Sequence, residues 1–323
     1  MSRKRSTPEA LAQSYSSETS CAAMPRFLTA LPVYNEQAHV VTVLEEVRKH
    51  ATDILVIDDG STDGTSQALT QCPWVKVVPH PKNLGYGAAL QTAFQYAIEH
   101  QYEVLITIDC DGQHEPQRIG QLVRACWSSP AHEDSPGLNS SGLNSSGLNF
   151  SVPDPPGGLD PSGGVESPSA HGKSFSPWRG SVDIVSGSRY LIIDQSTAPP
   201  PEARRQINAQ VTLELNRRLG LKLTDAFCGF KAYRVESLKQ LDLTETGYAM
   251  PLELWVQAAH HGLRIVEKPV PLVYLDEKRS FGGALDDAST RLVYYRKVID
   301  RALRACTNDS SPSLMGIRCG PCS

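Results

Sequence analysis

The sequence predicts an α/β fold in which a mostly parallel sheet carries helices on both of its faces. In the first 127 residues, short apolar runs alternate with helix-like segments. Several runs are continuously apolar, which is typical of strands buried on both faces. Acidic turns follow three of the runs directly, at the edge where open α/β sheets bind their ligands.

The first half of the chain supplies the alternating elements of such a sheet. Apolar runs predict strands at Phe27–Tyr34, Asp53–Ile57, Val75–Val78 and Val104–Ile108. Apolar residues recur at helical spacing in three segments, His39–Val47, Gly85–His100 and Pro116–Cys126. Pro116 favours a helix start, because an amide in the first turn has no helical partner in any case.

Residues 128–181 interrupt this pattern. They are rich in Ser, Gly, Pro and Asn and contain the repeat Gly-Leu-Asn-Ser-Ser between Gly137 and Asn149. Few large apolar residues occur there, so burial cannot offset the conformational entropy of the chain. We expect a disordered insertion in a surface loop, which folds tolerate because closure entropy grows slowly with loop length.

Order is expected to resume at Val182. The predicted elements are a strand at Asp183–Val185, helices at Ala203–Leu219, Leu252–His261 and Asp287–Ala305, and a pair of strands within Arg264–Tyr274. The helix at 287–305 has an apolar side surrounded by Lys and Arg residues. Two interpretations stay open, a surface helix packed on the domain and an interfacial helix that touches anionic lipid.

Composition excludes several classes of protein. The formal net charge of -4 provides no basic excess for binding nucleic acid. No apolar run reaches the length of a membrane span, about 18 residues. The N-terminus opens with Arg3, Lys4 and Arg5 but lacks the apolar stretch of a secretory signal, so we expect a cytoplasmic protein.

The eight cysteines predict no disulfide scaffold, because the chain is long and carries no export signal. Cys319 and Cys322 have the spacing of a thioredoxin-like redox pair, but only Ser323 follows, and no helix is there to lower a thiol pKa. We interpret the pair as reduced thiols in a flexible tail, with a metal contact as the alternative.

Two acidic turns follow the first two strands. The turn from Pro32 to Glu36 is also consistent with an ordinary strand-to-helix turn. The turn from Asp58 to Asp63 places two adjacent carboxylates after a buried run, which requires a cationic or hydrogen-bonding partner. We assign Asp59 to ligand binding and Asp63 to capping the next helix.

The third turn, from Asp109 to His114, places Asp109 and Asp111 on either side of one residue at a strand end. This spacing lets two carboxylates converge on one hard cation. Oxygen ligands and a partly open coordination shell suit Mg2+ or Mn2+, with substrate phosphates in the remaining positions. His114 is either a metal ligand or a turn residue.

In this order and spacing, the three turns resemble the inverting glycosyltransferases of family 2, especially those that use dolichyl or polyprenyl phosphate. The resemblance runs from about Phe27 to Tyr274 without the insertion. It implies a GT-A type fold, a UDP- or GDP-sugar donor, Mg2+ or Mn2+, and a polyprenyl-phosphate or glycan acceptor. A phosphate acceptor lies at a membrane surface, which implies peripheral contact with the inner face.

The resemblance also implies a division of the chain. We expect a disordered segment at 1–24, a nucleotide-binding half at 25–127, the insertion at 128–181, an acceptor-side half at 182–305 and a flexible tail at 306–323.

Residue roles follow from the matching motifs. Binding of the nucleotide sugar is implied for Pro32, Tyr34, Glu36, Ile57, Asp59, Asp109, Cys110, Gln113, Arg189, Arg204 and Arg279. The expected metal ligands are Asp109, Asp111 and Gln113. The expected catalytic residues are Asp111, Asp225 and Arg189.

Two arginine assignments also have physical arguments. Arg189 can make the forked contacts that phosphate favours, although a surface salt bridge is the alternative. Arg204 and Arg205 open a helix against the preference of the macrodipole, which a nearby phosphate would explain.

The expected reaction is in-line displacement at the anomeric carbon with inversion. The metal and Arg189 would stabilise the departing nucleoside diphosphate. A lipid phosphate is already an anion and needs no base. A sugar hydroxyl needs one, and Asp225 is the first candidate and Glu253 the second.

One motif departs from the family. Polyprenyl-phosphate transferases carry Arg-x-x-Gly-x-Ser-Lys after the last strand, whereas residues 279–285 keep the Arg and Gly and lack the Ser and Lys. This departure weakens the assignment of a lipid-phosphate acceptor, although Lys278 or Arg279 could still reach a phosphate. Transfer to a sugar hydroxyl in polysaccharide or glycolipid synthesis is the alternative.

Other functions fit the sequence less well. A dehydrogenase would carry Gly-x-Gly-x-x-Gly after the first strand, and the fragment from Asn83 to Gly87 lies elsewhere and lacks the third glycine. A pyrophosphorylase would carry a basic glycine-rich loop near the N-terminus. A non-catalytic sugar-nucleotide-binding protein predicts damaged metal ligands, but Asp109 and Asp111 are intact.

Overall fold

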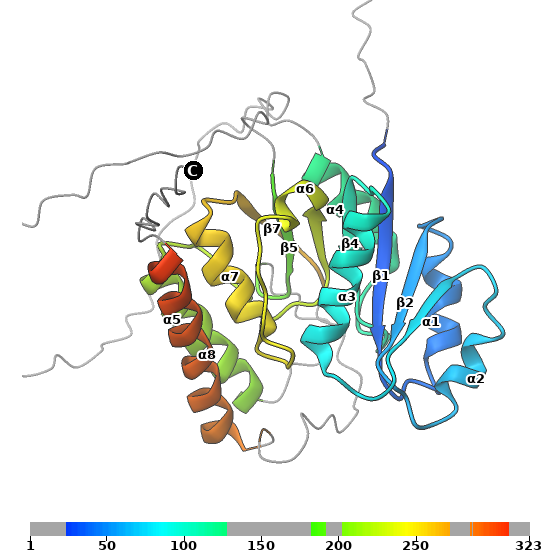
Figure 1. The fold of residues 1–323 in the computed structure, drawn as a ribbon, viewed down its shortest axis with the longest axis horizontal. Helices are drawn as coiled ribbons and strands as arrows, with labels where there is room; N and C mark the ends of the chain where they lie inside the picture. Colours follow the sequence, from blue (N-terminus) through cyan, green and yellow to red (C-terminus); the bar gives the residue numbers. More distant parts are fainter. Residues whose placement is uncertain (1–23, 128–181, 192–201, 272–284, 286, 310–323) are drawn as a thin grey trace, which may run out of the picture. The chain divides into compact units, whose positions relative to one another are not determined.

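The computed structural model describes residues 24–127, 182–191, 202–271, 285 and 287–309. These residues form a seven-stranded sheet of order β3-β2-β1-β4-β6-β5-β7 (Figure 1). The strands are β1 Phe27–Val33, β2 Ile54–Asp58, β3 Lys76–Pro79, β4 Val104–Thr107, β5 Ile184–Ser188, β6 Lys231–Arg234 and β7 Ile265–Pro269.

The sheet is mixed but mostly parallel, as predicted. β6 alone among these strands runs antiparallel, and it pairs with both β4 and β5. β6 was not predicted, because its four residues, Lys-Ala-Tyr-Arg, have a charged residue at each end. Both charged side chains are nevertheless buried. A pair of strands was predicted within residues 264–274. The described part of this segment, which ends at residue 271, contains the single strand β7, so the prediction is wrong there.

The predicted helices are present among the described residues, together with two short ones whose bounds were not predicted. Their bounds are α1 Val40–Val47, α2 Thr65–Leu69, α3 Tyr86–Glu99, α4 Ile119–Trp127, α5 Glu202–Leu219, α6 Val235–Leu238, α7 Met250–His260 and α8 Ala288–Asp309. A 3-10 turn at Pro116–Arg118, η2, precedes α4. α6 was not predicted, and α2 was expected only as the helix that Asp63 would cap, because four and five residues are too short to show a helical period.

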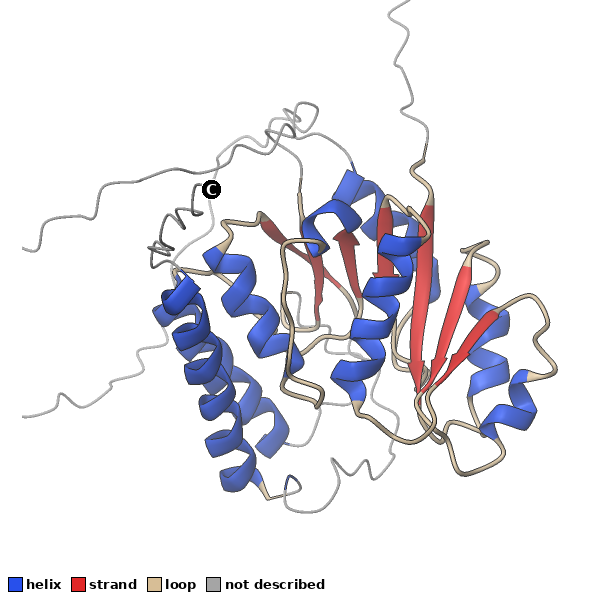
Figure 2. Cartoon of the chain, in the orientation of Figure 1, coloured by secondary structure: helices blue, strands red, loops and turns tan. Residues whose placement is uncertain are grey.

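Side chains of the strands alternate between two hydrophobic cores, so helices cover both faces of the sheet (Figure 2). On β2, Leu55 and Ile57 face the core that contains α3, α5, α7 and α8. Ile54 and Val56 face the core that contains α1, α2 and α4. This alternation explains why β2 reads as a continuous apolar run.

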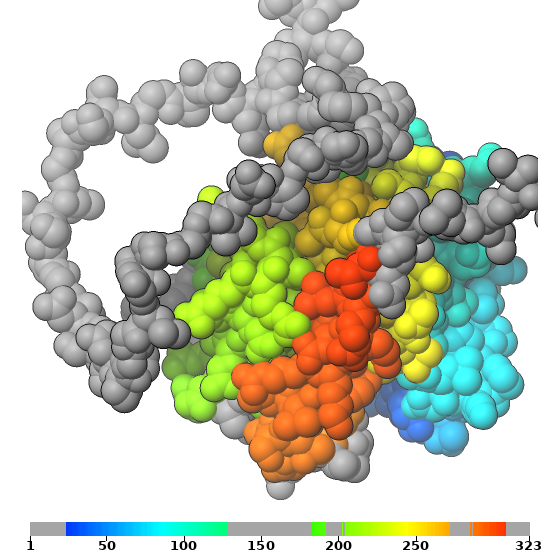
Figure 3. Space-filling view, turned by 60° about the vertical axis from the view of Figure 1, so that its left-hand side comes forward, coloured from blue at the N-terminus to red at the C-terminus, as the bar shows by residue number. Residues whose placement is uncertain are grey.

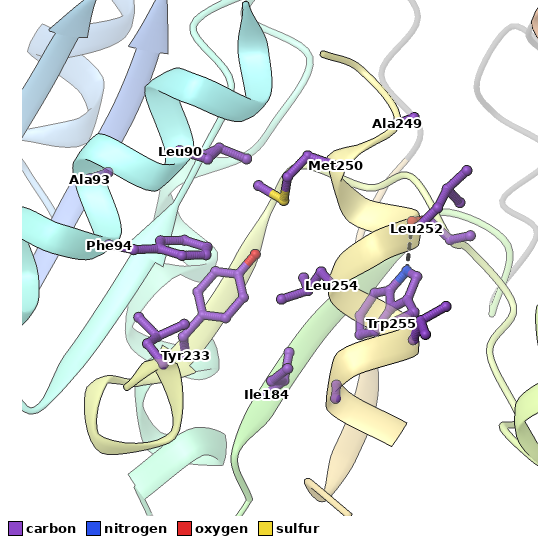
Figure 4. Close-up of a cluster of buried hydrophobic side chains, with 14 of the residues drawn as sticks. Leu90, Ala93, Phe94, Ile184, Tyr233, Ala249, Met250, Leu252, Leu254 and Trp255 are labelled. Carbon is purple, nitrogen blue, oxygen red and sulfur yellow. Dashed lines mark hydrogen bonds between the residues drawn. The ribbon is translucent and has the colours of Figure 1, made fainter. Parts of the chain in front are cut away.

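The larger core packs aromatic side chains against the sheet (Figure 4). The rings of Phe94 and Tyr233 lie with their centroids 5.0 Å apart. Trp255 is fully buried, and its indole N–H donates to the Ala226 carbonyl at 2.9 Å. α7 is thereby fixed to the segment that leads into β6.

α8 packs on the domain, which agrees with the first of its two interpretations. Tyr295, Val298 and Ile299 are buried, and α8 lies along α5 in the space-filling view (Figure 3). Two of its surrounding cations have acidic partners within the protein, since Arg296 pairs with Glu214 at 2.9 Å and Arg301 with Glu245 at 2.6 Å. Contact with lipid stays a prediction. Among the described residues, no helix is both long and apolar enough to cross a bilayer.

The insertion follows α4 and precedes β5 in the chain. Its two flanks, the end of α4 and the start of β5, are joined by Arg234. The guanidinium donates to the Cys126 carbonyl at 2.8 Å and to the Val182 carbonyl at 3.4 Å. The flanks are therefore held by residues outside the insertion.

Several predictions fall outside the described residues. They concern residues 1–23, the insertion at 128–181, Arg279 and its loop, and Cys319 and Cys322. The expected tail at 306–323 begins too early, because α8 continues to Asp309 and includes Cys306. The five cysteines in the described part of the chain are free thiols.

Candidate active site

The predicted functional turns meet at one edge of the sheet. β1, β2, β4 and β5 end there, and β6 begins there because Lys231 pairs with Thr107 of β4 and Ser186 of β5. The segment that contains Asp225 therefore arrives beside the acidic turns that follow β2 and β4.

Asn35 joins the first two acidic turns. It has a positive φ of 56°, which asparagine tolerates better than most residues. Its side-chain oxygen accepts hydrogen bonds from the Thr62 amide at 2.8 Å and the Asp63 amide at 3.3 Å. The backbone N–H of Asn35 donates to Ser61 Oγ at 3.0 Å. These long-range contacts fix the turn after β2 against the turn after β1.

A cavity of about 340 Å³ opens beside these turns. Its lining comes from the turns after β1 and β2 and from the segment after β3: Tyr34, Asp58, Gly60, Ser61, Thr62, Ser66, Pro79, His80, Pro81, Lys82 and Asn83. Tyr34 is exposed. The volume lies within the usual range of small-molecule sites.

The adjacent carboxylates of the second turn have different surroundings, and Asp59 is the one that was expected to bind the ligand. Asp59 does not line the cavity. It accepts hydrogen bonds from the amides of Leu84 and Gly85, both at 2.9 Å, and lies 2.7 Å from His80 Nδ1. Asp58 lines the cavity and accepts from Ser66 Oγ at 2.6 Å. The partners of Asp59 thus belong to the segment after β3.

Asp63 acts at the start of α2 as expected. Its side chain accepts a hydrogen bond from the Thr65 amide at 2.9 Å, which satisfies the first amide of the helix.

Two expected binding residues have buried side chains. Ile57 is completely buried in the core below α3, and Cys110 is 2% exposed in the core below α4. Only their backbone groups could reach a ligand, because both side chains are buried in the hydrophobic cores. Pro32, paired with Ile57 in the sheet, and Glu36 are half-buried near the turn.

The third turn follows β4 at the same edge of the sheet. The Asp109 side chain is 26% exposed, whereas Asp111 is buried and accepts the Gln113 amide at 2.9 Å. Asp109 Oδ1 accepts from the Tyr86 hydroxyl at 3.0 Å, and Asp109 Oδ2 lies 3.4 Å from His114 Nε2. Burial raises the pKa of Tyr86, as does the charge of Asp109, so the phenol keeps its proton at neutral pH.

Gly229 allows the chain before β6 to approach Asp109. A Cβ atom on Gly229 would lie 2.3 Å from Asp109 Oδ2. The Gly229 carbonyl accepts from Thr107 Oγ1 at 2.7 Å, which ties the same residue to the end of β4. Position 229 therefore leaves no room for a side chain while Asp109 keeps its place.

The third turn fits a hard divalent cation that completes its shell with substrate oxygens. Within the described ranges, no group of three or more His, Cys, Asp and Glu side chains could hold a metal alone. Asp109 and Asp111 offer oxygen ligands on one turn. His114 Nδ1 beside them is buried without a hydrogen-bond partner, which marks an unsatisfied polar position.

Arg189 and Asp225 form a buried, forked ion pair. Arg189 Nε lies 2.6 Å from Asp225 Oδ2, and Nη2 lies 2.9 Å from Oδ1. Asn208 and the Phe227 amide also donate to Oδ1, at 2.9 and 3.1 Å. The Asp225 side chain has no exposure to solvent, whereas that of Arg189 is 23% exposed. The surface salt bridge considered for Arg189 is therefore a largely internal pair.

The two carboxylates considered as general bases are both sequestered. Burial alone would raise the pKa of Asp225, but the charge and hydrogen bonds of Arg189 lower it below its ordinary range. Glu253 is 4% exposed and accepts hydrogen bonds from Thr244 and from the Glu245 amide at 2.6 Å. A base must reach a substrate proton, and neither carboxylate is free to do so.

The arginines at the start of α5 have an internal explanation. Glu202 occupies the first turn and pairs with Arg205 at 2.9 Å. The carboxylate of Glu202 thus offsets the unfavourable interaction between these cations and the helix dipole. A bound phosphate is not needed to explain why the arginines lie there. Arg204 is half-buried and also has contacts within the protein.

Residues 29–128 match the family model described as Glycosyl transferase family 2. The protein is a glycosyltransferase with a family 2 domain. It is similar to the undecaprenyl-phosphate mannosyltransferase of Micrococcus luteus, with 27% identity over 81% of this chain and 90% of that one. It is also similar to the polyprenol monophosphomannose synthase of Mycolicibacterium smegmatis, with 26% identity over 76% of each chain.

Solved structures show that the transferase has a GT-A type fold. The glucosyl-3-phosphoglycerate synthase of Mycobacterium tuberculosis, solved with Mn2+, UDP and glucosyl-3-phosphoglycerate, superposes with a TM-score of 0.55 at 15% identity. The match covers 87% of this chain and 80% of that one. At this identity the likeness concerns the fold alone.

The transferase also places residues in the site that the sequence analysis did not assign. Tyr86 contacts Asp109, and His80 contacts Asp59. Lys231, the first residue of β6, is buried. Burial lowers the pKa of Lys231, whose ammonium donates to the Cys228 carbonyl and lies 5.4 Å from the Trp255 ring centroid. The sequence did contain a signal for Tyr86. It lies in the glycine-rich fragment from Asn83 to Gly87, which follows a strand just as the acidic turns do.

Proposed function

We propose that this transferase moves a hexose from a nucleoside diphosphate sugar to a polyprenyl phosphate, with inversion at the anomeric carbon. The observation that carries the proposal is the sequestration of Asp225 and Glu253. An acceptor hydroxyl would need one of these groups as a base, whereas a phosphate acceptor already carries its negative charge. The names of two similar proteins, an undecaprenyl-phosphate mannosyltransferase and a polyprenol monophosphomannose synthase, point to the same acceptor class.

The cavity beside Asp58 is the proposed site for the base and ribose of the donor. Tyr34 would cover the base, and the loop after β3 would form the opposite wall. Asp109 and Asp111 would hold Mg2+ or Mn2+, with Gln113 beside them. Such a cation neutralises the charge that develops on the departing diphosphate.

Arg189 is the proposed cation on the acceptor side. Asp225 fixes its guanidinium through two contacts, and the exposed part of the side chain leaves donors for phosphate oxygens. In this proposal Asp225 positions Arg189, and no residue has to remove a proton. Arg204 and Arg279 are retained as lesser candidates for binding the phosphates.

A transfer assay tests the proposal. Labelled UDP- and GDP-hexoses would be supplied with Mg2+ or Mn2+ and polyprenyl phosphate in detergent, with Asp111→Ala as the control. A lipid-linked product that is lost in the control is the expected result, and it identifies the donor at the same time.

The other outcomes separate the alternatives. Slow metal-dependent hydrolysis of a donor without a lipid product would move the acceptor to a sugar hydroxyl, as in polysaccharide or glycolipid synthesis. Binding of a donor without any metal-dependent turnover would indicate a non-catalytic sugar-nucleotide-binding protein.

A further inference from the structure

Tyr86 contacts the most exposed carboxylate of the third turn from another element. It is the first residue of α3, and its hydroxyl donates to Asp109 Oδ1 at 3.0 Å. On the other side of the carboxylate, Asp109 Oδ2 faces His114 Nε2 at 3.4 Å and the backbone at Gly229. Tyr86 therefore restricts rotation of a side chain that is 26% exposed.

The backbone that carries Tyr86 is fixed by several contacts. Asp59 accepts the amides of Leu84 and Gly85, and the Ala88 amide donates to the Thr246 carbonyl at 3.1 Å. Gly85 has a φ of 107°, and a Cβ atom there would lie 2.4 Å from the Thr246 carbonyl oxygen. The start of α3 therefore has one position relative to the loop before α7.

The ring of Tyr86 is fixed as well. It stacks on Tyr248, with ring centroids 5.7 Å apart and planes inclined by 17°. Tyr248 belongs to the same loop that holds the start of α3, which Glu253 supports by accepting the Thr244 and Glu245 amides. Both the backbone and the ring thus direct the hydroxyl at Asp109.

We propose that Tyr86 is a positioning residue that orients Asp109 for binding the divalent cation. The inference rests on the proposed function, in which Asp109 is a metal ligand. Donors behind a ligating carboxylate select one orientation of it, and their loss commonly weakens metal binding by about 10- to 100-fold. Tyr86 does not touch the substrate in this proposal, so its effect appears in the affinity for metal.

Tyr86→Phe is the direct test, because it removes the hydroxyl and keeps the ring that stacks on Tyr248. Mn2+ binding would be measured by calorimetry on the full chain with saturating UDP, and again with GDP. We expect the Kd for Mn2+ to rise about 10-fold or more in the variant. In the transfer assay, the Mn2+ concentration for half-maximal rate should rise in parallel, while the rate at saturating Mn2+ changes much less.

Tyr96→Phe is the matched control. Tyr96 lies on the same helix about 15 Å further along, and its ring stacks on His100. This variant should bind Mn2+ like the wild type. Tyr248→Leu keeps the Tyr86 hydroxyl but removes its stacking partner, and we expect a smaller rise in Kd in the same direction.

The outcomes are distinguishable. If the wild type binds Mn2+ and Tyr86→Phe binds it within twofold, the role of Tyr86 is refuted while the proposed function stands. If the folded wild type binds no Mn2+ with either nucleotide, the metal-dependent function and the role of Tyr86 both fall. Unfolding curves would verify that each variant is folded.

Discussion

The nucleotide side and the acceptor side of the site are built differently. On the nucleotide side, residues 24–127, functional residues follow consecutive parallel strands, and short turns present them at the edge of the sheet. On the acceptor side, residues 182–309, the site depends on the antiparallel β6 and on a buried pair between residues 36 positions apart. Local motifs therefore locate the first side well, whereas burial decides what the charged groups of the second side can do.

The largest expected effect is loss of transfer on the nucleotide side. Asp111→Ala should lower the initial rate about 1,000-fold, because a bound cation contributes several kcal/mol to stabilising the transition state. The free energy of unfolding should change by only about 1 kcal/mol. Transfer assays and urea unfolding would measure both quantities, and a variant with more than a tenth of the activity would exclude Asp111 from the metal site.

A change on the acceptor side should act mainly on stability. Asp225→Asn leaves the Arg189 guanidinium largely buried without its counter-charge, which should lower the free energy of unfolding by about 3 kcal/mol. Arg296→Ala breaks the surface pair with Glu214 and should cost less than about 1 kcal/mol. Equal losses in the two variants, measured by urea unfolding, would contradict the inference that burial gives the Arg189–Asp225 pair the larger effect.

The same pair predicts a pH dependence. The pKa of Asp225 is lowered on folding, so the unfolded chain binds more protons than the folded one in acid. The stabilisation is present above the ordinary Asp pKa of about 3.9 and is lost as pH falls below it. Urea unfolding at pH 6, 4 and 3 should show the gap between wild type and Asp225→Asn shrinking at the lowest pH, and a constant gap would rule this out.

Gly229→Ala would show how far the two sides depend on each other. The added methyl group would displace the Asp109 carboxylate, so the Kd for Mn2+ should rise about 10-fold. Gly220→Ala is the matched control, because Gly220 has a φ of 68° with open space around it. That variant should lose about 1 kcal/mol of stability and keep its metal affinity. Unchanged Mn2+ binding in Gly229→Ala would mean that Asp109 does not need this close approach.

The smallest effect is expected for the insertion. Replacing residues 129–180 with a short Gly/Ser linker should leave the transfer rate unchanged and alter stability by less than about 2 kcal/mol, toward greater stability. Arg234 holds both flanks from outside the replaced segment. A large drop in the transfer rate with intact folding would assign a role to the insertion.

The sequence by itself determined the alternating elements, the mostly parallel sheet and the edge at which the three acidic turns meet. These features follow from apolar runs and local turn residues, which act over a few positions of the chain. For the same reason Asp63 was correctly assigned to the start of α2.

Only the tertiary structure decided which groups are free to act. Asp58 lines the cavity, whereas His80 and the amides of Leu84 and Gly85 engage Asp59. Asp225 is held by Arg189, and Tyr86 reaches Asp109 from α3. β6 buries two charged residues that no hydrophobic pattern could reveal. The physical reason is that protonation, orientation and access depend on partners far away in sequence, and only folding brings those partners together.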